Sequence, residues 1–199
     1  MTADEKFWLV KKQLFFCFTI IVGRIATDMP DHYFHFFANK NQLFREFRSD
    51  ILPVDILHKV GIKSSSLDEA YKALTTLKGL SGWWTTDTRG ESKVGGVIEF
   101  RFGAGGIDMK VLELDPAKRV LWQVVDGPAE WIGTKVSFDL RQEGDWITIL
   151  FKHQGWKEPV EFMHHCSTKW AVFLLSLKSL LETGKGAPAP NEIKLDSWE

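Results

Sequence analysis

Hydrophobic and polar positions alternate from Val54 onward, a pattern typical of a half-buried strand. In VDILHKVGIKS the side chains of Ile56, His58, Val60 and Ile62 share one face, because successive side chains of a strand point to opposite sides. The domain is therefore predicted to begin with a strand that has one buried face.

A short helix is predicted directly after this strand. Ser66 precedes LDEAYKALT and Glu69 follows three residues later, which together form a capping box. The expected apolar stripe consists of Leu67, Ala70, Tyr71 and Leu74. The helical section ends near Gly82, and two adjacent tryptophans, Trp83 and Trp84, follow it.

The next part of the chain reads as strands at close spacing. Strings such as VGGVIEFRFG, RVLWQVV and WITILFKHQGW alternate, and turn sequences such as Asp115-Pro116-Ala117-Lys118 separate them. Six consecutive strands without an intervening helix predict an antiparallel, curled sheet.

A long amphipathic helix is expected to close the domain, from Pro159 to a C-cap at Gly184. The stripe predicted to face the sheet is Met163, Cys166, Trp170, Phe173, Leu177 and Leu180. A helix about 37 Å long can lie in the concavity of a bent sheet. Two curved apolar faces that meet in this way need not close completely, so we expect an apolar chamber between them.

Three parts are expected along the chain: an N-terminal extension over 1–52, the domain over 53–186, and a flexible, Pro-rich tail over 187–199. The apolar run from Leu14 to Val22 is too short to span a bilayer, and no small-x-small cleavage site follows it. An interfacial membrane helix is the competing interpretation of the extension. His32 and His35 lack a further ligand, so no metal site is predicted there.

Composition narrows the function classes. The formal net charge of −1, from 25 basic and 26 acidic residues, gives no electrostatic footprint for a nucleic-acid partner. Cys17 and Cys166 belong to no CxxC pair, which favours inert thiols in a reducing cytoplasm over a metal or redox site. We expect a cytoplasmic protein without a cofactor and without a membrane partner.

The order of four sequence features resembles a known family. They are the first strand, SSSLDEAYKALTTLKGLSGWWTT, GGVIEFRFG, and the terminal FKHQGWKEPVEFMHHCSTKWAVFLLSLKSLLETG. Together, over about Val54 to Gly186, they resemble the START-like, or SRPBCC, superfamily, and within it the branch related to the C-terminal domain of the activator of the Hsp90 ATPase. The resemblance implies an α+β helix-grip fold, in which a curved antiparallel sheet wraps a long C-terminal helix around a cavity for apolar small molecules.

In this architecture the tryptophan pair would lie near the mouth of the cavity. Adjacent side chains diverge, so Trp83 and Trp84 are not expected to enter one core in the same way. We expect Trp84 to fill the core beneath the short helices and Trp83 to line or gate the opening. The alternative is that both rings only fill core volume.

The leading hypothesis is a carrier, sensor or sequestering protein for an apolar or aromatic small molecule. The predicted lining is Trp83, Phe100, Met109, Trp122, Phe138, Phe151, Met163, Trp170 and Phe173, with His58 and His153 as polar contacts. Since both histidines share the parity of buried positions, a second hypothesis makes them the acid and base of a cyclase- or dehydratase-like enzyme. The third, a chaperone partner, follows from the family resemblance alone, and the first fifty residues do not match the family. His164 is expected near the cavity mouth and His165 in solvent.

Overall fold

The computed structural model describes residues 54–63 and 65–195. The predictions for the extension over 1–52, including His32, His35 and Cys17, lie outside the described residues.

Seven strands form one antiparallel sheet in the order β1-β7-β6-β5-β4-β3-β2. β1 and β2 follow each other in the sequence but lie at opposite edges of the sheet, because β7 pairs with β1. The strands are β1 (Val54–Lys63), β2 (Asp87–Gly90), β3 (Val97–Phe102), β4 (Gly105–Asp115), β5 (Arg119–Asp126), β6 (Lys135–Glu143) and β7 (Trp146–Trp156).

Within residues 54–63 and 65–195 the chain also forms three helices, α3 (Leu67–Thr75), α4 (Leu77–Ser81) and α5 (Glu161–Thr183). The predicted capping box is present, because the Ser66 side chain accepts from the Glu69 backbone N–H while the Glu69 carboxylate accepts from that of Ser66. Gly184 ends α5 in the left-handed conformation, as a C-cap glycine does. Helix α5 begins two residues after Pro159, because Val160 keeps an extended backbone and serves as the N-cap.

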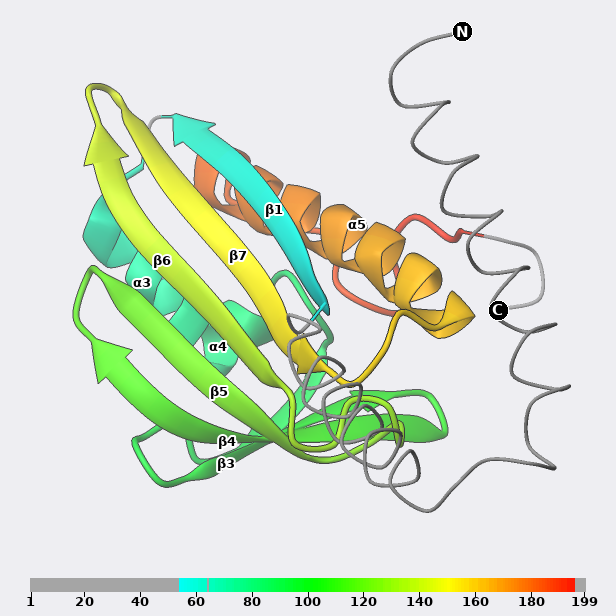
Figure 1. The fold of residues 1–199 in the computed structure, drawn as a ribbon. Coiled ribbons are helices and arrows are strands. Elements are labelled where there is room, and N and C mark those ends of the chain that lie inside the picture. Colours follow the sequence, from blue (N-terminus) through cyan, green and yellow to red (C-terminus); the bar gives the residue numbers. More distant parts are fainter. Residues whose placement is uncertain (1–53, 64, 196–199) are drawn as a thin grey trace, which may run out of the picture. The chain divides into compact units, whose positions relative to one another are not determined.

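The sheet bends around one side of α5 (Figure 1). Register shifts interrupt the pairing of β1 with β7 near Val54 and that of β4 with β5 near Asp108 and Val111. Such bulges bend a strand and increase its twist. The predicted α+β helix-grip fold is therefore confirmed.

Aromatic rings fill the space between the sheet and α5. The Trp84 ring lies 4.1 Å from that of Phe100 and 4.8 Å from that of Trp170, measured between centroids. Trp122 and Phe138 make an edge contact at 5.2 Å, and both are fully buried. Edge-on and offset arrangements of this kind are the favourable ones for aromatic pairs.

Both tryptophans of the pair are buried, with Trp83 0% and Trp84 2% exposed, and their rings stack at 5.8 Å. Both rings thus enter the core, which differs from the expectation that adjacent side chains would not enter one core in the same way. They lie in the turn after α4. Trp83 packs under the short helices and donates its indole N–H to the Ala73 carbonyl at 3.1 Å.

The segment after α5 folds back onto the domain, in contrast to the flexible tail expected from its composition. Ala189 donates its backbone N–H to the Trp84 carbonyl at 2.9 Å and accepts from the Thr86 N–H at 3.1 Å. Gly186 permits this return, because a Cβ there would lie 2.2 Å from the Gly82 carbonyl oxygen. Proline and polar content indicates loop structure, but the backbone groups here find partners on the turn after α4. We name residues 187–195 the terminal segment.

Ser176 joins three pieces of the fold. Its buried hydroxyl donates to the Trp83 carbonyl at 2.8 Å and accepts from the Ala187 backbone N–H at 2.7 Å. The single side chain thus connects α5, the start of the terminal segment and the turn after α4 that carries Trp83 and Trp84, which we name the tryptophan turn.

Replacing Ser176 with Ala is expected to lower the free energy of unfolding by roughly 1–3 kcal/mol, because the buried Trp83 carbonyl and the half-buried Ala187 N–H lose their partner. Urea denaturation measures the loss. Thr168→Ala on the exposed side of α5 is the control, expected to change stability by less than about 0.5 kcal/mol. Equal stability of the wild type and the Ser176 variant would contradict this role.

Candidate functional site

A cavity of about 730 Å³ lies between one end of the sheet, α5 and the terminal segment. The β3–β4 hairpin, the tryptophan turn and the β5–β6 loop complete its wall. The lining residues are Trp84, Thr85, Thr86, Asp87, Arg101, Phe102, Gly103, Gly105, Gly106, Ile107, Pro128, Trp131, Phe162, His165, Cys166, Lys169, Trp170, Phe173, Ala189, Pro190, Glu192 and Lys194. The site therefore combines an aromatic wall with a charged end.

The aromatic wall comes from several elements at once. Trp84 follows α4, Trp131 lies in the β5–β6 loop, and Trp170 and Phe173 come from α5. Trp131 stacks on Trp170 at 5.8 Å, and Phe102 packs against Phe173 at 6.2 Å. These contacts between rings of different elements hold the wall together.

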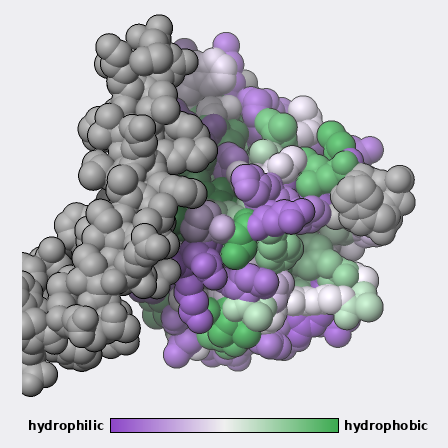
Figure 2. Space-filling model, turned by 45° about the vertical axis from the view of Figure 1, so that its right-hand side comes forward, coloured by the Kyte–Doolittle hydropathy of each residue, from purple (hydrophilic) through white to green (hydrophobic). Residues whose placement is uncertain are grey.

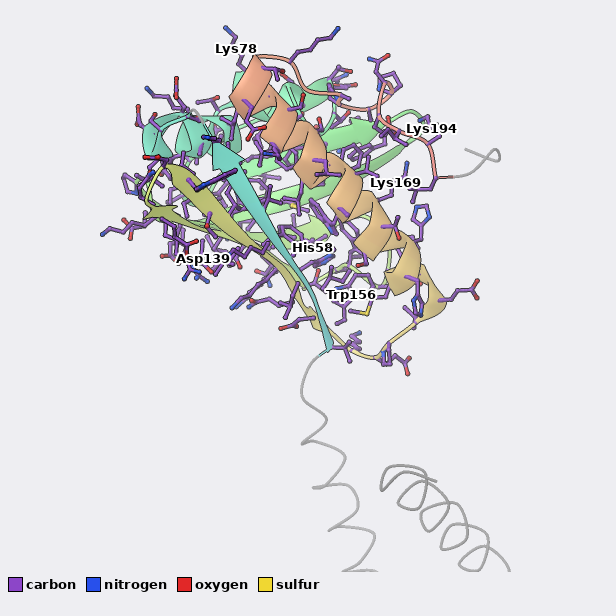
Figure 3. The ribbon with its side chains drawn as sticks, turned by 90° about the horizontal axis from the view of Figure 1, so that it is seen from above. His58, Lys78, Asp139, Trp156, Lys169 and Lys194 are labelled. Carbon is purple, nitrogen blue, oxygen red and sulfur yellow. The ribbon has the colours of Figure 1, made fainter. Side chains whose placement is uncertain are left out.

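The charged end is formed by α5 and the terminal segment. Glu192 accepts hydrogen bonds at one carboxylate oxygen from Lys169 at 3.2 Å and from Lys194 at 3.0 Å. Figure 3 shows Lys169 and Lys194 on the same side of α5. Burial raises the pKa of Glu192, but Lys194, the backbone N–H of Glu192 itself and Lys169 together lower it further, so the pKa lies below its ordinary value and the carboxylate is ionised.

Arg101 occupies the opposite rim and is held in an ion-pair network. It donates to Asp108 at 2.5 Å and to Glu99 at 3.0 Å on the outer face of β3 and β4. Its hydrogen bond to Asp108 raises the pKa of the guanidinium further. The guanidinium of Arg101 is therefore engaged by carboxylates of β3 and β4.

A buried hydrogen-bond chain lies next to the aromatic wall. The Trp170 indole N–H donates to Nδ1 of His153 at 3.1 Å, and His153 Nε2 lies 2.8 Å from the Thr134 hydroxyl. That hydroxyl donates onward to the Trp131 carbonyl at 2.5 Å. Since an indole N–H can only donate, Nδ1 must accept, and Nε2 carries the proton that it gives to Thr134. Burial lowers the pKa of His153 to about 3, in agreement with this neutral tautomer.

The other histidines lie in different surroundings. His58 is half-buried between β1 and α5, where its Nε2 lies 3.1 Å from the Ser167 carbonyl (Figure 3). His165 lines the cavity while His164 is exposed, the reverse of the expected arrangement. The side of α5 that borders the chamber carries Phe162, His165 and Lys169.

Cys166 also lines the cavity, and its thiol is inert. The Trp131 indole N–H donates to the sulfur at 3.3 Å, and burial raises the pKa of the thiol to about 11. A thiol protonated at neutral pH is a poor nucleophile, so Cys166 contributes apolar volume to the wall.

Of the predicted lining residues, Trp170 and Phe173 face the cavity. Met163 lies one position from the cavity-facing stripe of α5, at the edge of the core. The rest of the predicted aromatic and methionine set packs inside the core beyond the wall: Trp83, Phe100, Met109, Trp122, Phe138 and Phe151. His58 and His153 are likewise not among the lining residues. The role of every residue in the predicted set in ligand binding stays a prediction.

The two tryptophans exchange their expected places, since Trp84 lines the cavity and Trp83 fills the core under the helices. Sequence reasoning also missed Trp131, Phe162, Lys169 and Glu192. A usable signal existed on α5, where positions 162, 165, 169 and 173 recur at helical spacing beside the buried stripe. No such signal exists for Glu192, whose position depends on the return of the terminal segment.

Exposed large hydrophobic residues are scattered over several elements, from Leu57 on β1 to Ile193 in the terminal segment. Figure 2 shows hydrophilic and hydrophobic residues interspersed on the face that it presents. Within 54–63 and 65–195, no three His, Cys, Asp or Glu side chains are grouped to hold a metal ion. Of the helices in this part of the chain, none has the length and apolarity to cross a bilayer. The cavity is therefore the candidate site.

Comparisons with known proteins place the chain in a family. Residues 64–182 match the family described as activator of Hsp90 ATPase homolog 1-like protein, and the chain belongs to this family. The solution structure of the Aha1 dimer from Colwellia psychrerythraea is similar at 50% identity, with 67% of this chain and 99% of that chain covered and a TM-score of 0.63. A comparison with curated proteins gives no match.

More distant solved structures share the fold. CalU16 from Micromonospora echinospora is 18% identical, with 69% of this chain and 78% of that chain covered and a TM-score of 0.56. Protein BH1534 from Bacillus halodurans is 17% identical, with 66% and 100% covered and a TM-score of 0.55. The START-like membership predicted from the sequence is confirmed, and at the level of the family it supports a ligand-binding or co-chaperone-like role.

The pKa of His153 predicts a pH dependence of stability. Because this pKa is lower in the folded protein than the ordinary 6.5, the unfolded chain binds the proton more readily. The contribution of His153 is therefore complete above pH 6.5 and lost as the pH falls toward 3, at up to about 1.4 kcal/mol per pH unit. His153→Gln should lack this component when unfolding free energies are compared between about pH 6.5 and pH 4.

The exposed His164 supplies the matched control, because His164→Gln should keep the wild-type slope. Other groups titrate alike in the three proteins and cancel in the comparison. An unchanged slope in the His153 variant would show that the buried imidazole is not the source.

Proposed function

We propose that this protein binds an apolar, preferably aromatic, small molecule in the cavity between the sheet, α5 and the terminal segment. The observation that carries the proposal is the aromatic wall of Trp84, Trp131, Trp170 and Phe173 around about 730 Å³. Small-molecule sites are usually pre-formed, largely apolar hollows of roughly 300–1,000 Å³ with a few placed polar groups. A carrier, sensor or sequestering role fits such a site.

Burial would supply most of the affinity. Each apolar group of the ligand that is fully removed from water contributes roughly 1.5–3 kcal/mol, part of which offsets the entropy lost on association. The mutual packing of Trp131 and Trp170 reduces the entropy cost of binding, because these rings need little reordering.

The enzyme hypothesis depends on His58 and His153, and their surroundings do not favour it. Both ring nitrogens of His153 are engaged within the core, and its imidazole resists protonation. His58 lies on the other side of α5 and bonds Ser167. Neither histidine is among the lining residues, so ligand binding is better supported than catalysis by these two histidines.

A co-chaperone role is the second candidate, and family membership together with the 50% identity to the Colwellia Aha1 protein favours it. If the chain acts in this way, adding it in excess should raise the ATPase rate of the Hsp90 from the same host. A rate indistinguishable from that with an equal concentration of serum albumin would remove this candidate.

The cavity itself is tested by filling it. Gly105 pairs with Phe102 across the hairpin, so a side chain there would share the cavity face, and its Cβ would meet only the Phe102 carbonyl oxygen at 3.7 Å. Gly105→Trp is expected to weaken binding of the neutral fluorophore N-phenyl-1-naphthylamine by at least about tenfold, since one lost aromatic contact is worth about 1.4 kcal/mol or more. Fluorescence titration gives the dissociation constants.

Lys110→Trp is the control, because Lys110 lies on β4 with its exposed side chain on the outer face. It should bind the fluorophore as the wild type does. Non-saturable fluorescence in the wild type, or equal weakening by both substitutions, would contradict binding in this cavity.

A further inference from the structure

The charged end of the cavity holds a buried carboxylate with an unusual set of partners. The Glu192 side chain is only 5% exposed, and its Oε1 accepts from both Lys169 and Lys194. Its Oε2 is buried and has no hydrogen-bond partner within the described residues. One carboxylate oxygen therefore carries two cations while the other carries none.

This arrangement is costly for a side chain that belongs to the domain. An ionised carboxylate can accept at both oxygens, and a buried oxygen without a partner has lost its hydration with no hydrogen bond to replace it. The terminal segment is fixed to the tryptophan turn at Ala189, and the Asn191 N–H bonds to the Pro188 carbonyl within the segment. Glu192 thus lies beyond the backbone bonds that join the segment to the tryptophan turn, and it enters the chamber through its side chain.

The lysines, by contrast, belong to the site in different ways. Lys169 projects from the middle of α5, with its side chain 16% exposed and one turn from both His165 and Phe173. Of the other ionic lining residues, Arg101 pairs with Asp108, Asp87 pairs with Arg89, and Lys194 belongs to the terminal segment itself. Because α5 carries Lys169 next to Trp170, Lys169 is the cation that the helix holds beside the aromatic wall.

We propose that the ligand is an aromatic carboxylate, whose carboxylate replaces that of Glu192 beside Lys169 and Lys194, so that the terminal segment competes with the ligand for the cavity. This inference rests on the proposed function and names the chemical class of its ligand. The aromatic body lies against Trp84, Trp131 and Trp170, and the anionic group lies at the charged end. Unlike Glu192, a carboxylate brought in by the ligand can be oriented so that both oxygens face donors or water.

The experiment compares two probes of nearly equal shape, 2-naphthoate and 2-naphthalenemethanol, by displacement of N-phenyl-1-naphthylamine at neutral pH. The wild type should bind the acid at least about tenfold more tightly than the alcohol, and Lys169→Gln should abolish this preference. Lys152→Gln, which removes the same charge from β7 outside the lining, should keep it.

Competition by the terminal segment is tested with Glu192→Gln. Removing the resident charge should strengthen binding of 2-naphthoate several-fold and leave binding of the alcohol nearly unchanged. Glu158→Gln, at an exposed position, is the matched control and should change neither. Circular dichroism and urea denaturation confirm that each variant is folded.

The outcomes separate the two proposals. If the wild type binds both probes saturably with equal affinity, the inferred carboxylate is wrong and the apolar site stands. If the acid is preferred but Glu192→Gln does not strengthen it, competition by the terminal segment is overturned. If neither probe displaces the fluorophore and the fluorophore itself does not saturate, the proposed function fails together with the inference.

Discussion

The hydrogen bond from the Trp170 indole to His153 fixes how the long helix lies on the sheet. A large ring buried between α5 and β7 brings one polar N–H with it, and that N–H needs an acceptor. His153 supplies Nδ1 at 3.1 Å and passes its own proton to Thr134, whose hydroxyl donates to the Trp131 carbonyl. The chain is satisfied at every member, so it positions Trp131 and Trp170 together. Because those two rings form part of the aromatic wall, the core and the cavity share one constraint.

The cavity exists because the same helix meets the sheet unevenly. Beside Trp122, Phe138 and Phe151 the inner face of the sheet is closed by interlocking rings. Toward the β3–β4 hairpin, where Gly103, Gly105 and Gly106 carry no side chains, the helix and sheet leave space. The terminal segment closes this space, anchored through Ser176 at its start and paired with Thr86 at Ala189. Glu192 and Lys194 are the charged groups that this segment brings to the chamber.

Much of the fold could be predicted from local patterns. The alternation of hydrophobic and polar residues predicted the strands. Ser66 and Glu69 predicted the start of α3, and Gly184 predicted the end of α5. The site was harder to predict. The alternation along a strand separates the residues of the inner face from those of the outer face, but it does not indicate which inner residues line a cavity. Trp83 and Trp84 show the difficulty, since both are buried and only the turn after α4 decides which one reaches the chamber. Glu192 depends on a return of the chain that composition alone describes as a tail.

The most direct measurement is a two-dimensional ¹H–¹⁵N NMR titration of the indole N–H signals with N-phenyl-1-naphthylamine. Binding in the cavity predicts saturable shifts for Trp84, Trp131 and Trp170, which line it, while Trp122 and Trp156 in the packed core stay in place. Shifts centred on the exposed Trp146, or no saturable shift of any indole signal, would contradict the account.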